Sequence, residues 1–200
     1  MSDLVAVVLA GGRATRFGSD KLSAMLGDAP LLFHAIRAAR AAPVAKVIVV
    51  ARPGLAIGEW AGAPPVEVVR LDSTALSETL KAGIAAAGSA EGAFVFLGDM
   101  PRIPHAVAGR LARAIGPAYA AMPRHAGRPG HPVLLSARAF PEIATLTGDE
   151  GAGRLLRRRA DIVLEDCDDP AIHFDVDSPE DLASARNLAR DAPSSASGPG

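Results

Sequence analysis

The chain has 200 residues, 49% of them hydrophobic and 4% aromatic, and its formal net charge is -1. A chain of this length buries roughly 70% of the surface that its unfolded form exposes, so we expect a core that needs no structural metal, and the single cysteine cannot form a disulfide within the chain. The balanced charge and the scarcity of aromatic residues argue against binding to nucleic acid or to an anionic membrane.

The N-terminal half predicts alternating strands and helices. Residues 4–10 form a continuous apolar run, which is typical of a strand covered on both faces and is too short for a secretion signal or a membrane span. We therefore expect a cytoplasmic protein. Further predicted elements are helices at 30–41, 76–87 and 104–115 and strands at 46–51, 66–71 and 93–97. This alternation indicates an α/β fold with a Rossmann-like, doubly wound and mostly parallel sheet.

The C-terminal half does not continue this regular alternation of strands and helices. The predicted elements there are short strands at 118–122, 132–135 and 161–165 and a helix at 151–159. The turn-rich stretch A-G-R-P-G-H-P at 126–132 indicates a small antiparallel excursion. The last helix is expected to start after Ser178, an N-cap residue followed by proline and two acids. We expect one domain over residues 1–190 and a disordered tail over 191–200, where no apolar residue is larger than alanine.

The most informative segment directly follows the first predicted strand. Residues 9–22, L-A-G-G-R-A-T-R-F-G-S-D-K-L, combine adjacent glycines with three cations, Arg13, Arg16 and Lys21. Glycines let backbone amides approach a ligand closely and cations offset phosphate charge, so the segment is suited to a triphosphate. It contains neither a Walker A loop nor the three-glycine dinucleotide fingerprint.

This segment resembles the signature of the MobA-like NTP transferases, a family that includes molybdenum cofactor cytidylyltransferases and guanylyltransferases. The signature is roughly L-A-[AG]-G-x-x-x-R-[MF]-G-x-x-K, and the matching residues here are Leu9, Ala10, Gly11, Gly12, Arg16, Phe17, Gly18 and Lys21. In that family the loop wraps the triphosphate, and the resemblance implies the same for this chain. The alternative is a strand-to-helix turn that carries surface cations.

Two further segments carry carboxylates. L-G-D-M-P at 97–101 places Asp99 just past the carboxyl end of a predicted strand, the edge at which open α/β sheets bind ligands. It matches the family's G-D-M-P element, in which the acid coordinates magnesium, and D-V-D-S-P-E-D at 175–181 resembles a second family element. If that segment folds back to the same edge, Asp99 and Asp177 could hold one Mg²⁺ together with phosphate oxygens. Asp175 is a weaker candidate metal ligand than Asp177. The alternative role of Asp177 is helix capping.

Other segments resemble family elements that lie near the substrates. L-S-E-T-L at 76–80 is similar to a Ser-x-Ser/Thr-Leu element beside the base and ribose, and an ordinary capped helix is the alternative. G-R-P-G-H-P-V-L at 127–134 resembles a cytidylyltransferase element that faces the acceptor or the nucleotide. The stretch G-D-E-G-A-G-R-L-L at 148–156 resembles G-D-x-G-A-R-x-L-L, but Gly153 stands where the family has arginine and Arg154 follows one place later.

That one-residue shift leaves the position of the cation open, because one step along a helix turns a side chain by about 100°. Whether Arg154 reaches the ligand that the family arginine reaches does not follow from the sequence. The arginine run at 157–159 predicts a solvated face, with a contact to the acceptor phosphate as the alternative.

The resemblance implies a set of site residues in three overlapping groups. The catalytic residues would be Arg16, Lys21 and Asp99. The nucleotide would contact Leu9, Ala10, Gly11, Gly12, Arg13, Arg16, Lys21, Ser77, Gly98 and Asp99. The acceptor would contact Gly130, His131 and Arg154, and Mg²⁺ would be held by Asp99 and Asp177.

The function implied by the resemblance is Mg²⁺-dependent transfer of NMP from an NTP to a phosphorylated small molecule, with release of pyrophosphate. The leading version uses CTP and the molybdenum cofactor, and a molybdoenzyme or its chaperone is the implied protein partner. The L-A-G-G sequence and Asp20 before Lys21 instead resemble the guanylyltransferase branch, so GTP stays open. The alternatives are another acceptor, such as a sugar phosphate, methylerythritol phosphate or phospholactate, and a nucleotide-binding module without turnover.

Overall fold

The computed structural model describes residues 3–12, 20–73 and 75–191, and for 188–191 it describes the backbone alone. The strands are β1 (Leu4–Ala10), β2 (Met25–Leu26), β3 (Ala29–Pro30), β4 (Lys46–Ala51), β5 (Val66–Arg70), β6 (Gly92–Leu97), β7 (Ala120–His125), β8 (Arg128–Pro129), β9 (Val133–Ser136) and β10 (Ile162–Asp166). The α-helices are α1 (Leu31–Arg40), α2 (Leu76–Ala87), α3 (His105–Ala114), α4 (Phe140–Ile143), α5 (Ala152–Leu156) and α6 (Pro179–Asp191), and the 3₁₀ turns are η1 (Lys21–Ser23), η2 (Ala137–Ala139) and η3 (Pro170–His173).

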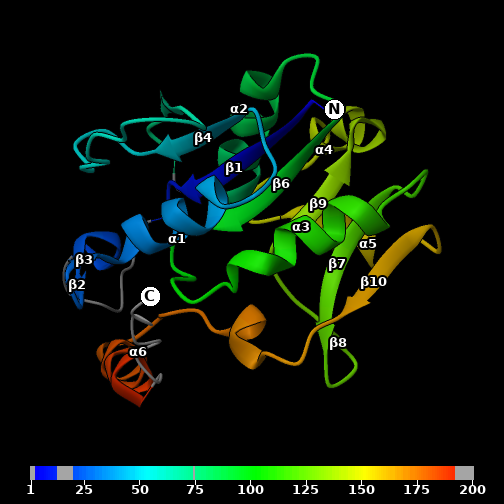
Figure 1. Cartoon of the computed structure of the whole chain (residues 1–200). Helices are drawn as coiled ribbons and strands as arrows, with labels where there is room; N and C mark the ends of the chain where they lie inside the picture. The colour runs from blue at the N-terminus through cyan, green and yellow to red at the C-terminus, as the bar shows by residue number, and fades with distance from the viewer. Residues whose placement is uncertain (1–2, 13–19, 74, 192–200) are drawn as a thin grey trace.

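Eight of these strands form one mixed sheet in the order β10-β7-β9-β6-β1-β4-β5, with β8 paired to β7 (Figure 1). The pairs β1–β4, β1–β6, β4–β5 and β7–β10 are parallel, and β9 is antiparallel to both β6 and β7. The strands β2 and β3 form a separate antiparallel hairpin. The predicted α/β fold, with a mostly parallel sheet and an antiparallel excursion, is therefore confirmed.

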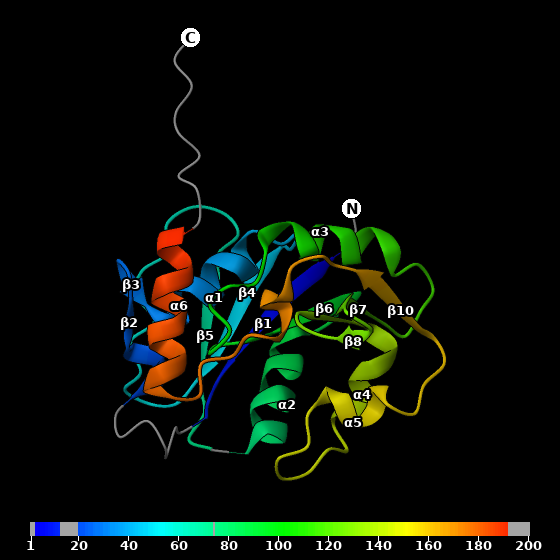
Figure 2. The same ribbon diagram turned by 90° about the horizontal axis from the view of Figure 1, so that it is seen from below.

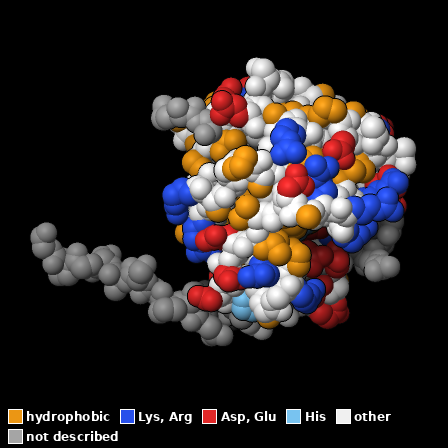
Figure 3. Space-filling view, turned by 90° about the vertical axis from the view of Figure 1, so that its right-hand side faces the viewer, with side chains coloured by type: hydrophobic (Ala, Val, Ile, Leu, Met, Phe, Trp, Pro, Cys, Tyr) orange, Lys and Arg blue, Asp and Glu red, His pale blue; other side chains and the backbone are white. Residues whose placement is uncertain are grey.

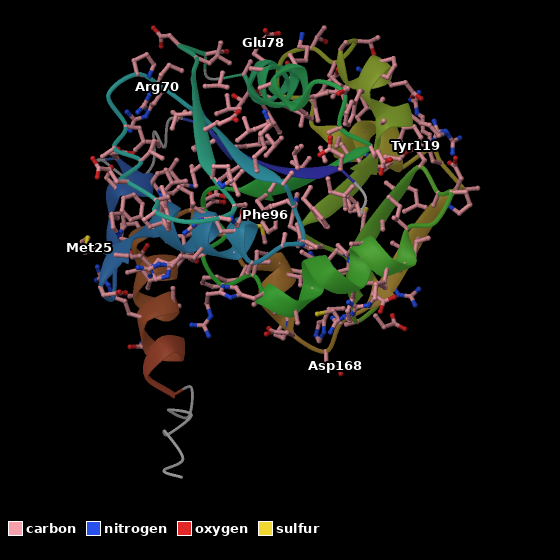
Figure 4. The ribbon with its side chains drawn as sticks, turned by 45° about the horizontal axis from the view of Figure 1, so that its top comes forward. Met25, Arg70, Glu78, Phe96, Tyr119 and Asp168 are labelled. Carbon is pink, nitrogen blue, oxygen red and sulfur yellow. The ribbon has the colours of Figure 1, made fainter. Side chains whose placement is uncertain are left out.

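Helices cover both faces of the sheet (Figure 2). Alternate residues of β1 point to opposite faces, so that Ala6 and Val8 belong to the core cluster that includes α1, whereas Val7 belongs to the cluster that includes α2. All seven residues of β1 are buried, which explains why this strand is apolar along its whole length. Phe96, 1% exposed, lies at the centre of the fold, and Met25 lies at its edge (Figure 4).

The C-terminal segment returns to the middle of the sheet after β10. The Val176 amide donates a hydrogen bond to the Asp99 carbonyl at 3.0 Å, and the Val176 side chain is fully buried. Ser178 caps α6: its hydroxyl accepts from the Asp181 amide at 3.1 Å, and the Asp181 carboxylate accepts from the Ser178 amide at 2.9 Å. The predicted start of the last helix is thus confirmed. The predicted tail lies outside the described residues, apart from Asp191 at the end of α6.

The predicted helix at 151–159 is wrong in its length, since α5 ends at Leu156. Tertiary contacts of Arg159 favour a non-helical backbone after Leu156. The Arg159 guanidinium donates hydrogen bonds to Asp161 at 2.9 Å and to Glu142 at 3.1 Å, and it lies 3.5 Å from the centre of the Tyr119 ring. The hairpin β2–β3 and the one-turn helix α4 were not predicted, because elements of two to four residues carry too little periodicity.

The charged surface agrees with the balanced composition. On the face shown in Figure 3, basic and acidic side chains lie interspersed. Within the described ranges, no helix is both long enough and apolar enough to cross a bilayer.

Replacing Gly83 by Ala should destabilise the fold. An added Cβ on this α2 glycine would lie 2.3 Å from Val7 Cγ1 and 3.2 Å from Val50 Cγ2, both on buried strands. The packing cost of ~1–3 kcal/mol outweighs the gain of about 1 kcal/mol in helix propensity. Urea unfolding measures the change.

Gly109→Ala on α3 is the matched control for Gly83→Ala. Its added Cβ would meet only the flexible end of Arg113, at 3.6 Å, so helix propensity should raise the free energy of unfolding by up to about 1 kcal/mol. If the two substitutions changed stability in the same direction, close packing of α2 on β1 would not be the reason for glycine at position 83.

Candidate active site

The candidate site lies where the strand order changes direction. From β1 the chain proceeds to β4 and β5 on one side, and it crosses to β6 on the other side. The carboxyl ends of β1 and β6 are adjacent, because Leu9 pairs with Leu97 and the Gly98 amide donates to the Leu9 carbonyl at 2.9 Å. Ligands of open α/β sheets bind at such a switch point, outside the carboxyl ends of the strands.

Close packing requires glycine at two of the predicted positions. A Cβ on Gly11 would lie 2.5 Å from the Thr79 hydroxyl on α2, and a Cβ on Gly98 would lie 2.9 Å from the Leu9 carbonyl. No atom of the described residues lies within 4 Å of a Cβ built on Gly12, and Ala10, the last residue of β1, is buried. Of the predicted phosphate ligands, Arg13 and Arg16 lie outside the described residues.

Lys21 joins two carboxylates that are far apart in the sequence. Its ammonium lies 3.0 Å from Asp99 Oδ2 and 2.9 Å from Asp177 Oδ1. The Lys21 side chain is 12% exposed, Asp99 26% and Asp177 64%, so the group sits at the mouth of the site rather than in the core. The structure therefore brings together three of the residues that the sequence singled out, from the loop after β1, the turn after β6 and the segment before α6.

The electrostatics of this group favour a bound cation. Burial alone would lower the pKa of Lys21, but the hydrogen bond to Asp177 and the charge of Asp99 outweigh it and raise that pKa. Burial raises the pKa of the nearby Asp175 carboxyl, and the charges of Asp177 and Asp99 act in the same direction. Asp99 and Asp177 already reach one cation, and carboxylate oxygens are the ligands that Mg²⁺ prefers. These two residues could hold a divalent ion.

Two residues outside the predicted site position Lys21 and Asp177. Asp181 accepts a hydrogen bond from the Asp177 amide at 3.1 Å, in addition to its bonds with Ser178. Arg52, which follows β4, pairs with Asp20 at 2.5 Å and so fixes the residue before Lys21. The sequence indicates Asp181 only as one of two acids in the first turn of the last helix. The three-residue spacing of Ser178 and Asp181, typical of a capping box, is a sequence signal for the role of Asp181. No sequence motif indicates the role of Arg52.

A cleft of about 470 Å³ lies next to this group, on the face of the sheet covered by α2 and α5. Its apolar lining includes Leu9 and Leu97, the residues that immediately precede the site at the ends of β1 and β6. Its polar or charged lining residues are His131, Asp149, Glu150, Arg154 and Arg157.

The predicted substrate contacts differ in their access to this cleft. His131 lines it, and burial lowers the pKa of its imidazole, which is therefore neutral at pH 7. Gly130 packs tightly, since a Cβ there would lie 2.6 Å from the Ile172 carbonyl. Ser77 is fully buried, and its hydroxyl has no hydrogen-bond partner among the described residues. Arg154 is 48% exposed and pairs with Glu150.

Comparison with known proteins identifies similar chains. A family model described as the MobA-like NTP transferase domain matches residues 6–163. The purine catabolism protein PucB of Bacillus subtilis (strain 168) is 29% identical over 198 residues, which cover 92% of this chain and 96% of PucB.

Two solved structures share the fold over almost the whole chain. The homologue of Rv0371c from Mycobacterium sp. strain JC1 has a TM-score of 0.80 and 29% identity, with 92% of this chain and 98% of that chain covered. A complex of Mycobacterium tuberculosis Rv0371c with manganese has a TM-score of 0.78 and 24% identity, with 93% and 99% covered.

Replacing Lys21 by Met should raise the affinity for Mn²⁺, measured by calorimetry without nucleotide, by about fivefold or more. The substitution removes the positive charge that competes for Asp99 and Asp177, and a unit charge about 4 Å away contributes about 1 kcal/mol even in water. Lys46→Met is the control, because it removes a lysine that pairs with Glu67 at the start of β4. Equal affinities in the two variants would show that the carboxylates do not form a cation site.

Proposed function

Because the chain belongs to the MobA-like NTP transferase family and is therefore a nucleotidyltransferase, we propose that it transfers CMP from CTP to the molybdenum cofactor and releases pyrophosphate. The observation that carries this proposal is the meeting of Lys21 with Asp99 and Asp177 at the switch point, directly beyond the glycines that follow β1. A lysine and two carboxylates beside a glycine-rich turn suit the phosphates of a nucleotide and their metal ion.

The metal ion in this proposal is Mg²⁺. Asp99 and Asp177 would hold it, and when bound it would offset the negative charge of the triphosphate. The fit rests on the donor set, which consists of carboxylate oxygens that already share one cation.

The protein groups would bind and orient the triphosphate. The backbone at Gly11 and Gly12 allows phosphates to approach closely, with Arg13 and Arg16 from the following segment as further ligands. Lys21 stays protonated at neutral pH, since its pKa is raised, and would donate hydrogen bonds to phosphate oxygens as pyrophosphate leaves.

No strong protein base is required for the attack. The acceptor is a phosphate monoester, whose second pKa is about 6, so it is mostly ionised near pH 7. Orientation of two bound substrates and neutralisation of their charge then supply most of the rate enhancement. This agrees with the neutral His131 in the cleft, which would contact the acceptor as a hydrogen-bonding group rather than as an acid.

The cleft and the sequence elements together support the choice of substrates. Its volume of about 470 Å³ falls in the range of small-molecule sites, roughly 300–1,000 Å³, and its largely apolar lining suits a flat heterocycle. The elements G-D-M-P, G-H-P-V-L and D-V-D-S-P-E-D favour CTP. A second candidate is GTP, which L-A-G-G and Asp20 before Lys21 favour.

Pyrophosphate release distinguishes these substrates. With Mg²⁺ and molybdenum cofactor, we expect release from CTP to exceed release from GTP by about tenfold or more in kcat/KM. Faster pyrophosphate release from GTP than from CTP would show that the CTP proposal is wrong and would support the guanylyltransferase reaction instead. No release from any NTP, with the molybdenum cofactor or with other phosphorylated acceptors, would refute the proposed function.

Asp99→Asn should lower turnover by about 10²-fold or more, because it removes one of the two charges that hold the metal ion. The matched control is Asp168→Asn, which neutralises an exposed aspartate on the loop after β10 that pairs with neither Lys21 nor the cleft residues among the described interactions (Figure 4). Both variants should unfold at the wild-type temperature. Normal turnover in Asp99→Asn would remove Asp99 from the metal site.

A further inference from the structure

Arg157 lies over Gly153, the position at which the family element G-D-x-G-A-R-x-L-L has an arginine. It follows α5 directly, and its Nη1 atom is 3.8 Å from the point that a Cβ on Gly153 would occupy. Residues four apart lie on the same side of a helix, so the Arg157 side chain covers the patch of α5 that a side chain at 153 would cover. Gly153, Arg154 and Arg157 all line the cleft beside the carboxylate group.

The arginines around α5 differ in their pairing. Arg154 is bound by Glu150, and Glu150 is itself held because its carboxylate accepts from the Thr147 amide at 2.9 Å. Arg159 is turned away from the cleft and pairs with Glu142 and Asp161. Among the residues that the structure describes, Arg157 makes no ion pair with a carboxylate. Its charge is therefore available to a ligand, whereas those of Arg154 and Arg159 are already matched.

The surroundings of Arg157 suit an anion with a flat apolar body. The cleft is lined by Leu9, Leu97 and Met122 on the sheet, and its apolar lining strengthens a charge interaction by excluding water. A guanidinium group forms two parallel hydrogen bonds with a phosphate monoester, which gives orientation as well as affinity. Leu97, which lines the cleft, immediately precedes Gly98 and Asp99, so a phosphate held in the cleft would lie near the sheet edge at which we propose that the nucleotide binds.

We propose that Arg157 binds the phosphate of the acceptor, and that it supplies from one turn further along the chain the cation that Gly153 cannot provide. This inference rests on the proposed function for the identity of the acceptor, a phosphate monoester attached to a heterocycle. The guanidinium lies where a side chain at 153 would begin, so the two positions can present a cation to the same patch of α5.

The first test compares Arg157→Ala with Arg158→Ala. Arg158 is the adjacent exposed arginine and does not line this cleft, so it is a matched control for charge and position. With the molybdenum cofactor as acceptor, Arg157→Ala should raise the KM for the acceptor by roughly 10- to 100-fold and leave the KM for CTP unchanged. An equal acceptor KM in the two variants, or a raised KM for CTP in Arg157→Ala, would overturn the proposal.

The second test moves the charge back to position 153. Adding Gly153→Arg to Arg157→Ala should restore the acceptor KM to within about threefold of the wild-type value, since both side chains would reach the same patch of α5. A merely structural role of Arg157 would not be rescued in this way, so failure of the rescue with a folded protein counts against the proposal.

A third measurement does not depend on turnover. Calorimetric titration with inorganic phosphate should show binding that is weakened about fivefold or more in Arg157→Ala and unchanged in Arg158→Ala. If the wild type releases no pyrophosphate from any NTP, the proposed function fails while this titration still decides whether Arg157 forms an anion site. Equal phosphate binding in both variants would refute the site itself.

Discussion

Two carboxylates that reach toward the same point repel each other, and the arrangement is stable only when a cation lies between them. Lys21 is that cation, bound to Asp99 on one side and to Asp177 on the other. Three distant parts of the chain must therefore meet at one edge of the sheet. The reversal of strand order between β1 and β6 creates this edge, and the remaining structure holds the three segments against it.

Much of the fold could be predicted from local patterns. The strands β1 and β4 and the helix α2 span the expected residues, because continuous apolar runs and a well-marked helix produce strong periodic signals. Asp99 and Lys21 could be singled out because each follows a buried parallel strand within a recognisable motif. The return of the C-terminal segment to the sheet was a condition stated for Asp177, and the bond from the Val176 amide to Asp99 meets it.

The remaining features depend on contacts that no local pattern contains. Arg52 fixes Asp20 across two loops, and Arg159 ends α5 early by pairing with residues from other elements. The role inferred for Arg157 belongs to the same class. Its sequence neighbours indicate a solvated face, and only the structure shows that its guanidinium lies over Gly153 and lines the cleft. Sequence thus specifies which chemical groups are present, while tertiary packing specifies which of them remain available.

The bond between Lys21 and Asp177 spans 156 residues. The family model ends at residue 163, so one of the two carboxylates comes from the chain beyond the matched region. During synthesis, the glycine-rich turn, Lys21 and Asp99 leave the ribosome well before Asp177. A chain that stops before Asp177 would carry Lys21 and Asp99 without their third partner. The carboxylate pair therefore forms only after the chain has been translated at least through Asp177.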